Sequence, residues 1–249
     1  GSCDKVLLGE FFDSGSTGVA SVEAAAQVLA SSLSAVSSLG ASHATSACST
    51  DDTVHAALIG PARSVSSESV ARIGAFAKLP QLSYWSSSAG LSDVDQYPYF
   101  GRTFPTDRSA AKAACVLWQG LGYTAAAIVY TSDVWGTAWS NALEMSCEAV
   151  GVRVTSFGFE MLSAPSITAQ VTALARTGVS VVLAAVSGSY ELQQLISAAV
   201  HSSMLDGSRL WMFTDGTTTD DVDALTPSTR AAISNALFIY AVGGSAENP

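Results

Sequence analysis

The sequence predicts an α/β protein built on parallel sheets, and three observations support this prediction. Short apolar runs recur along the chain, and each ends at Gly, Ser, Asp or Thr. Amphipathic stretches with helical spacing separate these runs, as expected where a sheet is covered by helices on both faces. A chain of 249 residues, 48% of them hydrophobic, can fill one large core or two modest ones, so a two-lobed architecture fits.

The pattern places the elements in order along the chain. The expected strands cover residues 6–8, 56–59, 81–84, 125–130, 179–185, 210–213 and 237–240. The expected helices include residues 109–121, 137–149 and 190–201. The apolar helix faces that the spacing predicts are Val22/Ala26/Leu29/Leu33/Val36, Ala110/Ala114/Leu117/Leu121, Ala138/Ala142/Met145/Ala149 and Ile167/Val171/Leu174.

The stretch FFDSGSTG at residues 11–18 resembles the loop that carries a catalytic carboxylate in pepsin-type aspartic proteases. Such an enzyme is a β protein with two facing loops of this kind. The nearest second candidate, Thr214–Gly216, lacks the residue between Asp and Gly, and the predicted helices contradict an all-β fold. Asp13 is therefore expected to be a polar residue at the end of a strand.

Composition excludes several other classes of function. The formal charge of −10 repels nucleic acid and anionic lipid, and no apolar run approaches the ~20 residues that span a bilayer. The cysteines and histidines show no zinc-ligand spacing, and no nucleotide-binding or catalytic motif is present. We therefore expect neither an enzyme nor a bound metal or cofactor. His43, His55 and His201 are expected to be structural.

The loops that follow the predicted strands carry the polar residues from which a site could be built. In a parallel sheet, ligands bind beyond the carboxyl ends of the strands. Hydroxyl groups beside helix N-termini suit an anion, whereas aspartates near an aromatic ring suit an ammonium group. A simpler interpretation stays open from spacing alone: Ser64, Ser66 and Ser67 could serve only to cap a helix.

Residues 56–144 resemble the receptor family ligand-binding region. This is the type I periplasmic-binding-protein fold, or Venus flytrap, of class C G-protein-coupled receptors, natriuretic-peptide receptors and bacterial amino-acid-binding proteins. The resemblance lies in motifs that follow one another with the family's spacing. They are I-G-P at Ile59–Pro61, L-P-Q-L-S-Y at Leu79–Tyr84, L-S-D at Leu91–Asp93, Y-P-Y-F-G-R-T at Tyr97–Thr103, P-T-D at Pro105–Asp107 and the pair Trp135-Gly136.

The resemblance implies a two-lobed fold that binds a small, amino-acid-like molecule in the cleft between the lobes. Ser64 and Ser87 match the hydroxyls that hold the ligand carboxylate, and Ser86 would contribute only backbone. Around the ligand ammonium the family places an acid, an aromatic residue and a second acid, which match Asp107, Trp135 and Asp215.

Two departures from the family's pattern bear on the ligand. Arg63 and Val65 flank Ser64 where small hydroxyl residues are usual, and Trp135 replaces the usual tyrosine. Arg63 is available to pair with an acidic ligand.

The resemblance also implies the domain boundaries. Residues 1–105 form the first lobe, residues 106–240 form the second, and residues 241–249 begin the crossing between them. The first lobe lacks its usual first strand and helix, and we expect the gap beside residues 5–12 to be filled by a segment of another chain rather than closed by rearrangement. The expected partners are thus a small ligand and either a homodimer or a segment that completes the first lobe.

The four cysteines fit either two disulfides or buried free thiols. Cys115 and Cys147 lie on helices before and after the strand at residues 125–130. Because parallel connections are right-handed, these helices should pack side by side, so we predict a bridge between the two residues. Cys3 and Cys48 form a second candidate pair.

These observations predict an extracellular ligand-binding domain of a signalling receptor. The alternative is a non-catalytic assembly or adhesion module that keeps the binding fold without a ligand.

Overall fold

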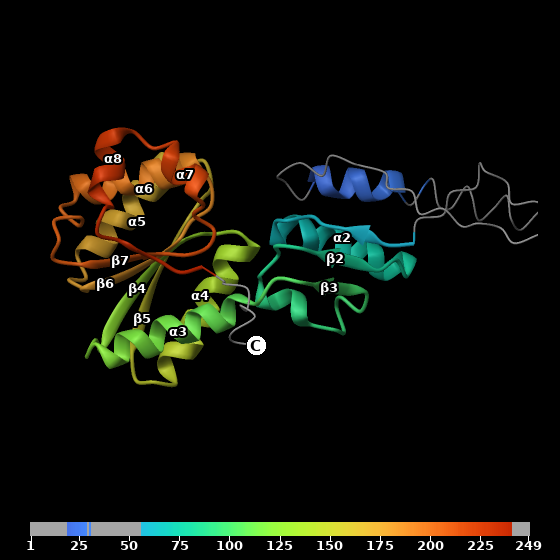
Figure 1. The fold of residues 1–249 in the computed structure, drawn as a ribbon, viewed down its shortest axis with the longest axis horizontal. Helices are drawn as coiled ribbons and strands as arrows, with labels where there is room; N and C mark the ends of the chain where they lie inside the picture. The colour runs from blue at the N-terminus through green and yellow to red at the C-terminus, as the bar shows by residue number, and fades with distance from the viewer. Residues whose placement is uncertain (1–18, 29, 31–55, 241–249) are drawn as a thin grey trace, which may run out of the picture. The chain divides into compact units, whose positions relative to one another are not determined.

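The computed structural model describes residues 19–28, 30 and 56–240, and it divides the chain into two compact units. The first unit spans Gly1–Phe104 and the second spans Pro105–Pro249. Within each unit the strands are parallel and helices pack against the sheet (Figure 1). The α/β fold with parallel sheets is therefore confirmed.

The first unit is organised around a three-stranded sheet in the order β1-β2-β3. Its elements are β1 (Leu58–Ile59), α2 (Ser64–Ala77), β2 (Gln81–Ser83), the 3-10 helix η1 (Ala89–Ser92) and β3 (Phe100–Arg102). A small core of Ala71, Leu91 and Tyr97 packs with Phe100 beneath α2. Residues 19–28 form a further helix.

The second unit alternates strands and helices along the chain. It contains α3 (Asp107–Gly120), β4 (Ala125–Thr131), α4 (Val134–Glu148), β5 (Arg153–Phe159), α5 (Ala164–Ala175), β6 (Val181–Ala185), α6 (Ser189–His201), β7 (Leu210–Phe213), α7 (Thr219–Asp223), α8 (Pro227–Ala232) and β8 (Leu237–Phe238). Its five strands lie in the order β5-β4-β6-β7-β8, and all pair in parallel.

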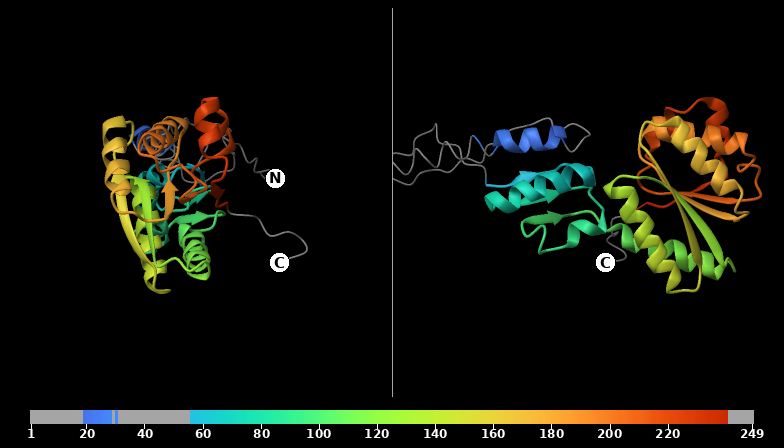
Figure 2. Two further views of the ribbon diagram at one scale, coloured as in Figure 1. Left: turned by 90° about the vertical axis from the view of Figure 1, so that its left-hand side faces the viewer. Right: turned by 180° about the vertical axis from the view of Figure 1, so that it is seen from behind.

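Helices cover both faces of this twisted sheet (Figure 2). One apolar core lies beneath α3 and α4, and a second lies beneath α5 and α6. The central strand β6 is completely buried along its five residues, which explains its continuous apolar sequence. Because the strands are parallel, their carboxyl ends meet at one edge, and that edge positions the polar loops.

The predicted apolar face is right for α5 and partly wrong for α3 and α4. In the helix at residues 19–28 both described positions of the predicted face, Val22 and Ala26, are exposed, and Leu29, Leu33 and Val36 lie outside the described residues. Ile167, Val171 and Leu174 of α5 are fully buried, as predicted. In contrast, Val22, Leu117 and Met145 are exposed. The faces that are buried instead are Ser21/Ala24/Ala25/Val28, Ala111/Ala114/Cys115/Trp118 in α3 and Trp135/Trp139/Ala142/Leu143/Cys147 in α4.

The physical reason is the abundance of alanine. An alanine-rich helix presents several apolar stripes of similar strength, and the largest side chains decide which stripe faces the core. Trp118 and Trp139 have no exposed surface, and burying a whole indole ring outweighs burying a leucine or methionine side chain.

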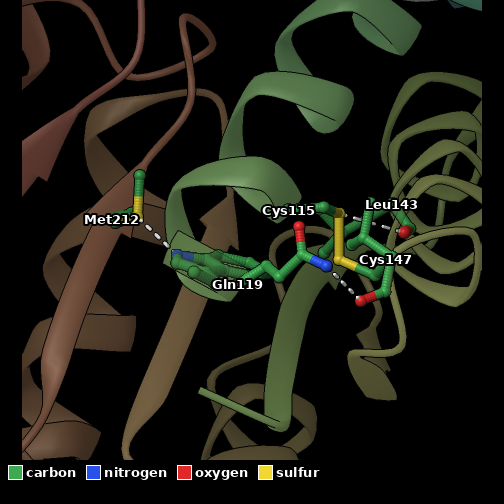
Figure 3. The surroundings of a disulfide bond; sticks show 7 residues. Cys115, Gln119, Leu143, Cys147 and Met212 are labelled. Atoms are coloured by element: carbon green, nitrogen blue, oxygen red, sulfur yellow. Dashed lines mark hydrogen bonds between the residues drawn. A yellow bond between two sulfur atoms is a disulfide. The ribbon is translucent and has the colours of Figure 1, made fainter. Parts of the chain in front are cut away.

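The predicted disulfide between Cys115 and Cys147 is confirmed, with a distance of 2.02 Å between the sulfur atoms. It joins α3 to α4, the two helices that flank β4 in sequence (Figure 3). Near the bridge, Gln119 Nε2 donates a hydrogen bond to the Val150 carbonyl at 3.0 Å. This bond also connects the C-terminal end of α3 to the residues that follow α4.

Several predictions lie outside the described residues. These are the pairing of Cys3 with Cys48, the role of Asp13, the strand at residues 6–8, and the crossing at residues 241–249. The segment of another chain that is expected to fill the gap beside residues 5–12 belongs with them.

Candidate functional site

Each unit carries a group of polar residues at the carboxyl edge of its parallel sheet. In the first unit, Ser64 is the first residue of α2, and Ser86 and Ser87 follow β2. In the second unit, Asp107 begins α3, Trp135 lies in the first turn of α4 and Asp215 follows β7. We call the first group, with Ser67, Ser83 and Ser88, the serine cluster. We call the second group, with Thr214, the acidic cluster.

The serine cluster is held together by hydrogen bonds around the Pro61 carbonyl. That carbonyl accepts bonds from the hydroxyls of Ser83 at 2.6 Å and Ser67 at 2.9 Å. Ser86 Oγ lies 3.0 Å from the Ala62 carbonyl oxygen and 2.8 Å from Ser67 Oγ, and its single proton can be donated to either of them. The Ser86 hydroxyl is thus used within the protein.

Ser64 does not cap α2. The N-cap residue is Arg63, whose backbone is extended and whose side chain makes no capping hydrogen bond. Instead, Ser64 Oγ accepts the backbone N–H of Ser88 at 3.2 Å. The capping interpretation is therefore wrong for Ser64, and the first turn of α2 has no side chain bonded to it as an N-cap.

Arg102 in β3 fixes the other side of the loop after β2. Its Nη1 donates to the carbonyl groups of Ser86 at 3.1 Å and Ser88 at 2.7 Å. The loop is therefore bonded to α2 through Ser64 and to β3 through Arg102. Such a doubly anchored loop holds its groups in a fixed arrangement before any ligand binds.

In the second unit, Trp135 packs against the residue that follows Asp215. A Cβ atom at residue 216 would lie only 2.2 Å from Cη2 of Trp135, so the indole ring packs directly on the backbone beside Asp215. Only glycine fits at residue 216 with the ring in this position. The close approach places the indole ring against the residue that follows Asp215.

The start of α4 fixes the position of Trp135. Asp133 caps the helix, because its Oδ1 accepts the backbone N–H of Gly136 at 2.7 Å. A Cβ atom at residue 136 would lie 2.0 Å from the Thr131 carbonyl oxygen, so the helix packs against the end of β4 through a glycine. The pair Trp135-Gly136 therefore combines an aromatic side chain with the close packing that orients it.

Asp215 is a largely buried carboxylate. Among the described residues, no hydrogen-bond donor reaches its Oδ1, which has almost no solvent contact. Burial raises the pKa of Asp215 to about 6, while backbone N–H groups of Asp215 and Gly216 act in the opposite direction. The pKa of Tyr240 is also raised, first by its burial and second by the nearby charge of the Asp215 carboxylate.

Asp107 is almost completely buried at the first residue of α3. The helix leads into β4, so it begins at the edge of the sheet where the strands end. Asp107 therefore lies at the same edge as Trp135 and Asp215.

Sequence reasoning missed Thr214 and the hydroxyl of Ser88. Both residues are buried, and their hydroxyl oxygens have no hydrogen-bond partner within the part of the chain that is described. Strand alternation could have identified Thr214, because residues 212 and 214 share a face of the sheet and Met212 contributes to the core beneath α3 and α4. Nothing in the spacing separates Ser88 from its two serine neighbours.

Chemically, the two clusters differ in the charge that they suit. Hydroxyls at the N-terminus of α2 suit an anionic group, and the buried carboxylate with its aromatic neighbour suits a cationic one. In the described ranges, no three His, Cys, Asp or Glu residues are arranged to hold a metal ion. None of the helices in those ranges is both long and apolar enough to cross a membrane.

Comparison with protein families gives one match. Residues 6–243 match the family described as "Receptor family ligand binding region". The match covers both units, including every residue of the two clusters.

Curated relatives match a shorter part of the chain. Metabotropic glutamate receptor-like protein E of Dictyostelium discoideum is 33% identical over 100 residues, which is 40% of this chain and 12% of the relative. Human taste receptor type 1 member 1 is 33% identical over 98 residues, 39% of this chain and 12% of the relative. G-protein coupled receptor family C group 6 member A of Carassius auratus is 33% identical over 98 residues, 39% of this chain and 11% of the relative. The matched part thus spans about an eighth of each relative's length.

Proposed function

Because this chain belongs to the receptor family ligand binding region, of the type found in class C G-protein-coupled receptors, we propose that it binds an amino acid or a related zwitterion. In this proposal the serine cluster offers partners for a carboxylate group, and the acidic cluster offers partners for an ammonium group. The domain acts outside the cell, as part of a receptor, and binds its ligand without chemical change.

The buried carboxylate of Asp215 carries this proposal. A carboxylate oxygen that has no solvent contact and no hydrogen-bond donor among the described residues is unfavourable, and burial raises the pKa of Asp215 to about 6. An ammonium group would supply both a positive charge and donors. The Trp135 ring, which packs against the neighbouring Gly216, adds an aromatic group of the kind that attracts cations.

The serine cluster supports the other half of the proposal. The first turn of α2 begins at Ser64, and the side chain of its N-cap residue, Arg63, makes no capping hydrogen bond. Neighbouring hydroxyls and backbone N–H groups are the usual partners of a carboxylate at such a position. The internal hydrogen bonds around Pro61 keep these groups in place.

A thermal-unfolding screen of the 249-residue chain against the common amino acids tests the proposal. A ligand present at about 100 times its dissociation constant should stabilise the protein by about 2.7 kcal/mol. Derivatives of the best ligand with an acetylated amine or an amidated carboxylate serve as controls, since each removes one charge. The proposal is wrong if no amino acid raises the unfolding temperature, or if both blocked derivatives bind as well as the parent.

A further inference from the structure

Asp215 lies in a tight turn after β7 whose two ends are held by hydrogen bonds. The Thr217 N–H donates to the Thr214 carbonyl at 3.0 Å, which closes a β-turn with Asp215 at one of its two central positions. At one end, the Thr214 N–H donates to the Ala184 carbonyl of β6 at 3.2 Å. At the other end, the buried Thr217 hydroxyl donates to the Val186 carbonyl at 3.1 Å. The position of the Asp215 carboxylate therefore depends on the groups that hold Thr214 and Thr217.

Tyr240 supports this turn from the segment that follows β8. Its hydroxyl donates to the Thr217 carbonyl at 3.1 Å. Its ring stacks on Phe238 of β8, with 6.1 Å between the ring centroids, and Phe238 in turn stacks on Phe213 of β7 at 5.4 Å. The Ile239 N–H donates to the Phe213 carbonyl at 2.8 Å, which fixes the backbone just before Tyr240. The phenol is thus oriented by its ring as well as by its hydrogen bond.

Tyr240 also lies close to the carboxylate itself. The pKa of Tyr240 is raised first by burial and then by the charges of Asp215 and Asp221. The pKa of Asp215 is raised by burial, and backbone N–H groups of the turn act in the opposite direction. A turn that is held at Thr217 keeps the carboxylate in these buried surroundings, whereas a released turn would let it move toward solvent.

We propose that Tyr240 is a positioning residue of the acidic cluster: by holding the Thr217 carbonyl, it keeps the Asp215 carboxylate buried and in place to bind a cationic group. The inference rests on the proposed function for the nature of that group, an ammonium, and adds a residue outside the cluster that controls its affinity. Such a residue acts by preorganisation, since a group that is fixed before binding loses little conformational freedom when the ligand arrives.

The variant Tyr240→Phe tests the inference, because it removes the hydroxyl and keeps the ring that stacks on Phe238. The pKa of Asp215 can be measured in the 249-residue chain by ¹³C NMR of labelled aspartate carboxyl groups, with Asp215→Asn used to assign the signal. In the wild type this pKa should be about 6, and in Tyr240→Phe it should fall toward the ordinary value of 3.8 as the carboxylate gains solvent.

Calorimetry with glycine, L-alanine and L-glutamate measures the consequence for binding. At pH 8, each of these probes that binds the wild type should bind Tyr240→Phe about threefold to tenfold more weakly. At pH 5 the difference should shrink, because Asp215 of the wild type is then largely protonated while that of the variant is still partly ionised. A change of this kind in the pH profile is not expected if Tyr240 has only a structural role.

Tyr123→Phe is the matched control. Tyr123 is half-buried and lies just before β4, at the opposite edge of the same sheet. Loss of its hydroxyl should leave the pKa of Asp215 and the binding of the probes unchanged. The Tyr240 side chain is 45% exposed, so Tyr240→Phe is expected to fold, and thermal unfolding of both variants verifies this.

The outcomes separate this inference from the proposed function. If the pKa of Asp215 is the same in Tyr240→Phe and in the wild type, Tyr240 only secures the end of β8 and the inference is wrong, whether or not a probe binds. If the pKa falls and a probe keeps its full affinity at every pH, the inferred control of affinity is wrong. If the pKa falls but no common amino acid binds, the positioning of Asp215 is supported and the proposed function fails.

Discussion

The serine cluster and the acidic cluster lie at equivalent edges of their sheets, yet they satisfy their polar groups differently. Around Pro61, the hydroxyls of Ser67, Ser83 and Ser86 all bond within the protein. In the second unit, Thr214 Oγ1 and Asp215 Oδ1 are buried without a partner among the described residues. The first cluster is already organised in the unliganded protein, whereas the second gains most from a ligand.

The largest difference should appear in ligand affinity. Asp215→Ala should weaken binding of the amino acid identified in the screen by about 2 to 5 kcal/mol, because it leaves a buried ammonium unpaired. Ser64→Ala should cost only about 0.5 to 1.5 kcal/mol, because backbone donors remain. Calorimetry on both variants measures the contrast. Equal and negligible losses would place the ligand elsewhere.

The next largest effect should be a gain in stability. The pKa of Asp215 in the folded protein, about 6, is above the ordinary value of 3.8, so the unliganded protein loses stability as the pH rises between these values. Asp215→Asn should therefore raise the free energy of unfolding at pH 8 by about 2 kcal/mol and change little near pH 3.5. Denaturant unfolding at both pH values tests this.

Asp95→Asn is the control for that measurement, since Asp95 is an exposed acid of the first unit. It should alter stability by no more than about 0.5 kcal/mol at either pH. If Asp215→Asn is destabilising at pH 8, the buried carboxylate has a partner that stabilises it, and the contrast between the clusters fails.

A smaller change, this time a loss of stability, is expected from a substitution in the serine cluster. Ser83→Ala removes the 2.6 Å bond to the Pro61 carbonyl and the acceptor of the Ser86 N–H, so it should destabilise the protein by about 1 to 2 kcal/mol. Ser109→Ala, at an exposed position of α3, should be close to neutral. A neutral Ser83→Ala would show that the internal bonds contribute little.

The smallest effect should follow from Thr214→Val. The substitution keeps the shape of the side chain and removes a buried hydroxyl that has no partner in the described structure, so stability should stay equal or rise by up to about 1 kcal/mol. Thermal unfolding of the unliganded variant measures this. A loss above about 1 kcal/mol would mean that the hydroxyl is bonded, for example through a water molecule.

The sequence was sufficient for the features that depend on chain order. Apolar runs between helices predicted the parallel sheets, and the positions of Cys115 and Cys147 on either side of β4 predicted their bridge. The buried helix faces were predicted less well, because alanine offers no size difference between competing stripes. Leu117 and Trp118 are adjacent in sequence, yet only the tryptophan is buried.

For the candidate site, the sequence could propose the residue types but not the hydrogen bonds. Family motifs identified Ser64 and Asp215, whereas the convergence of Ser67 and Ser83 on one carbonyl depends on the path of the backbone at Pro61. Local sequence statistics favour helix caps for serines at such positions, and they cannot show that Ser64 instead bonds a loop 24 residues away.

The bridge between Cys115 and Cys147 also affects how the second unit opens. It closes a covalent ring of chain around β4, since the two cysteines are 32 positions apart, and a closed ring has far fewer extended states. Partial unfolding that separates α3 from α4 is therefore blocked while the bond is intact. Amides of β4 should consequently exchange with solvent only in openings that release the ring as a whole, whereas those of β8, at the sheet's edge and outside the ring, can exchange in smaller local openings.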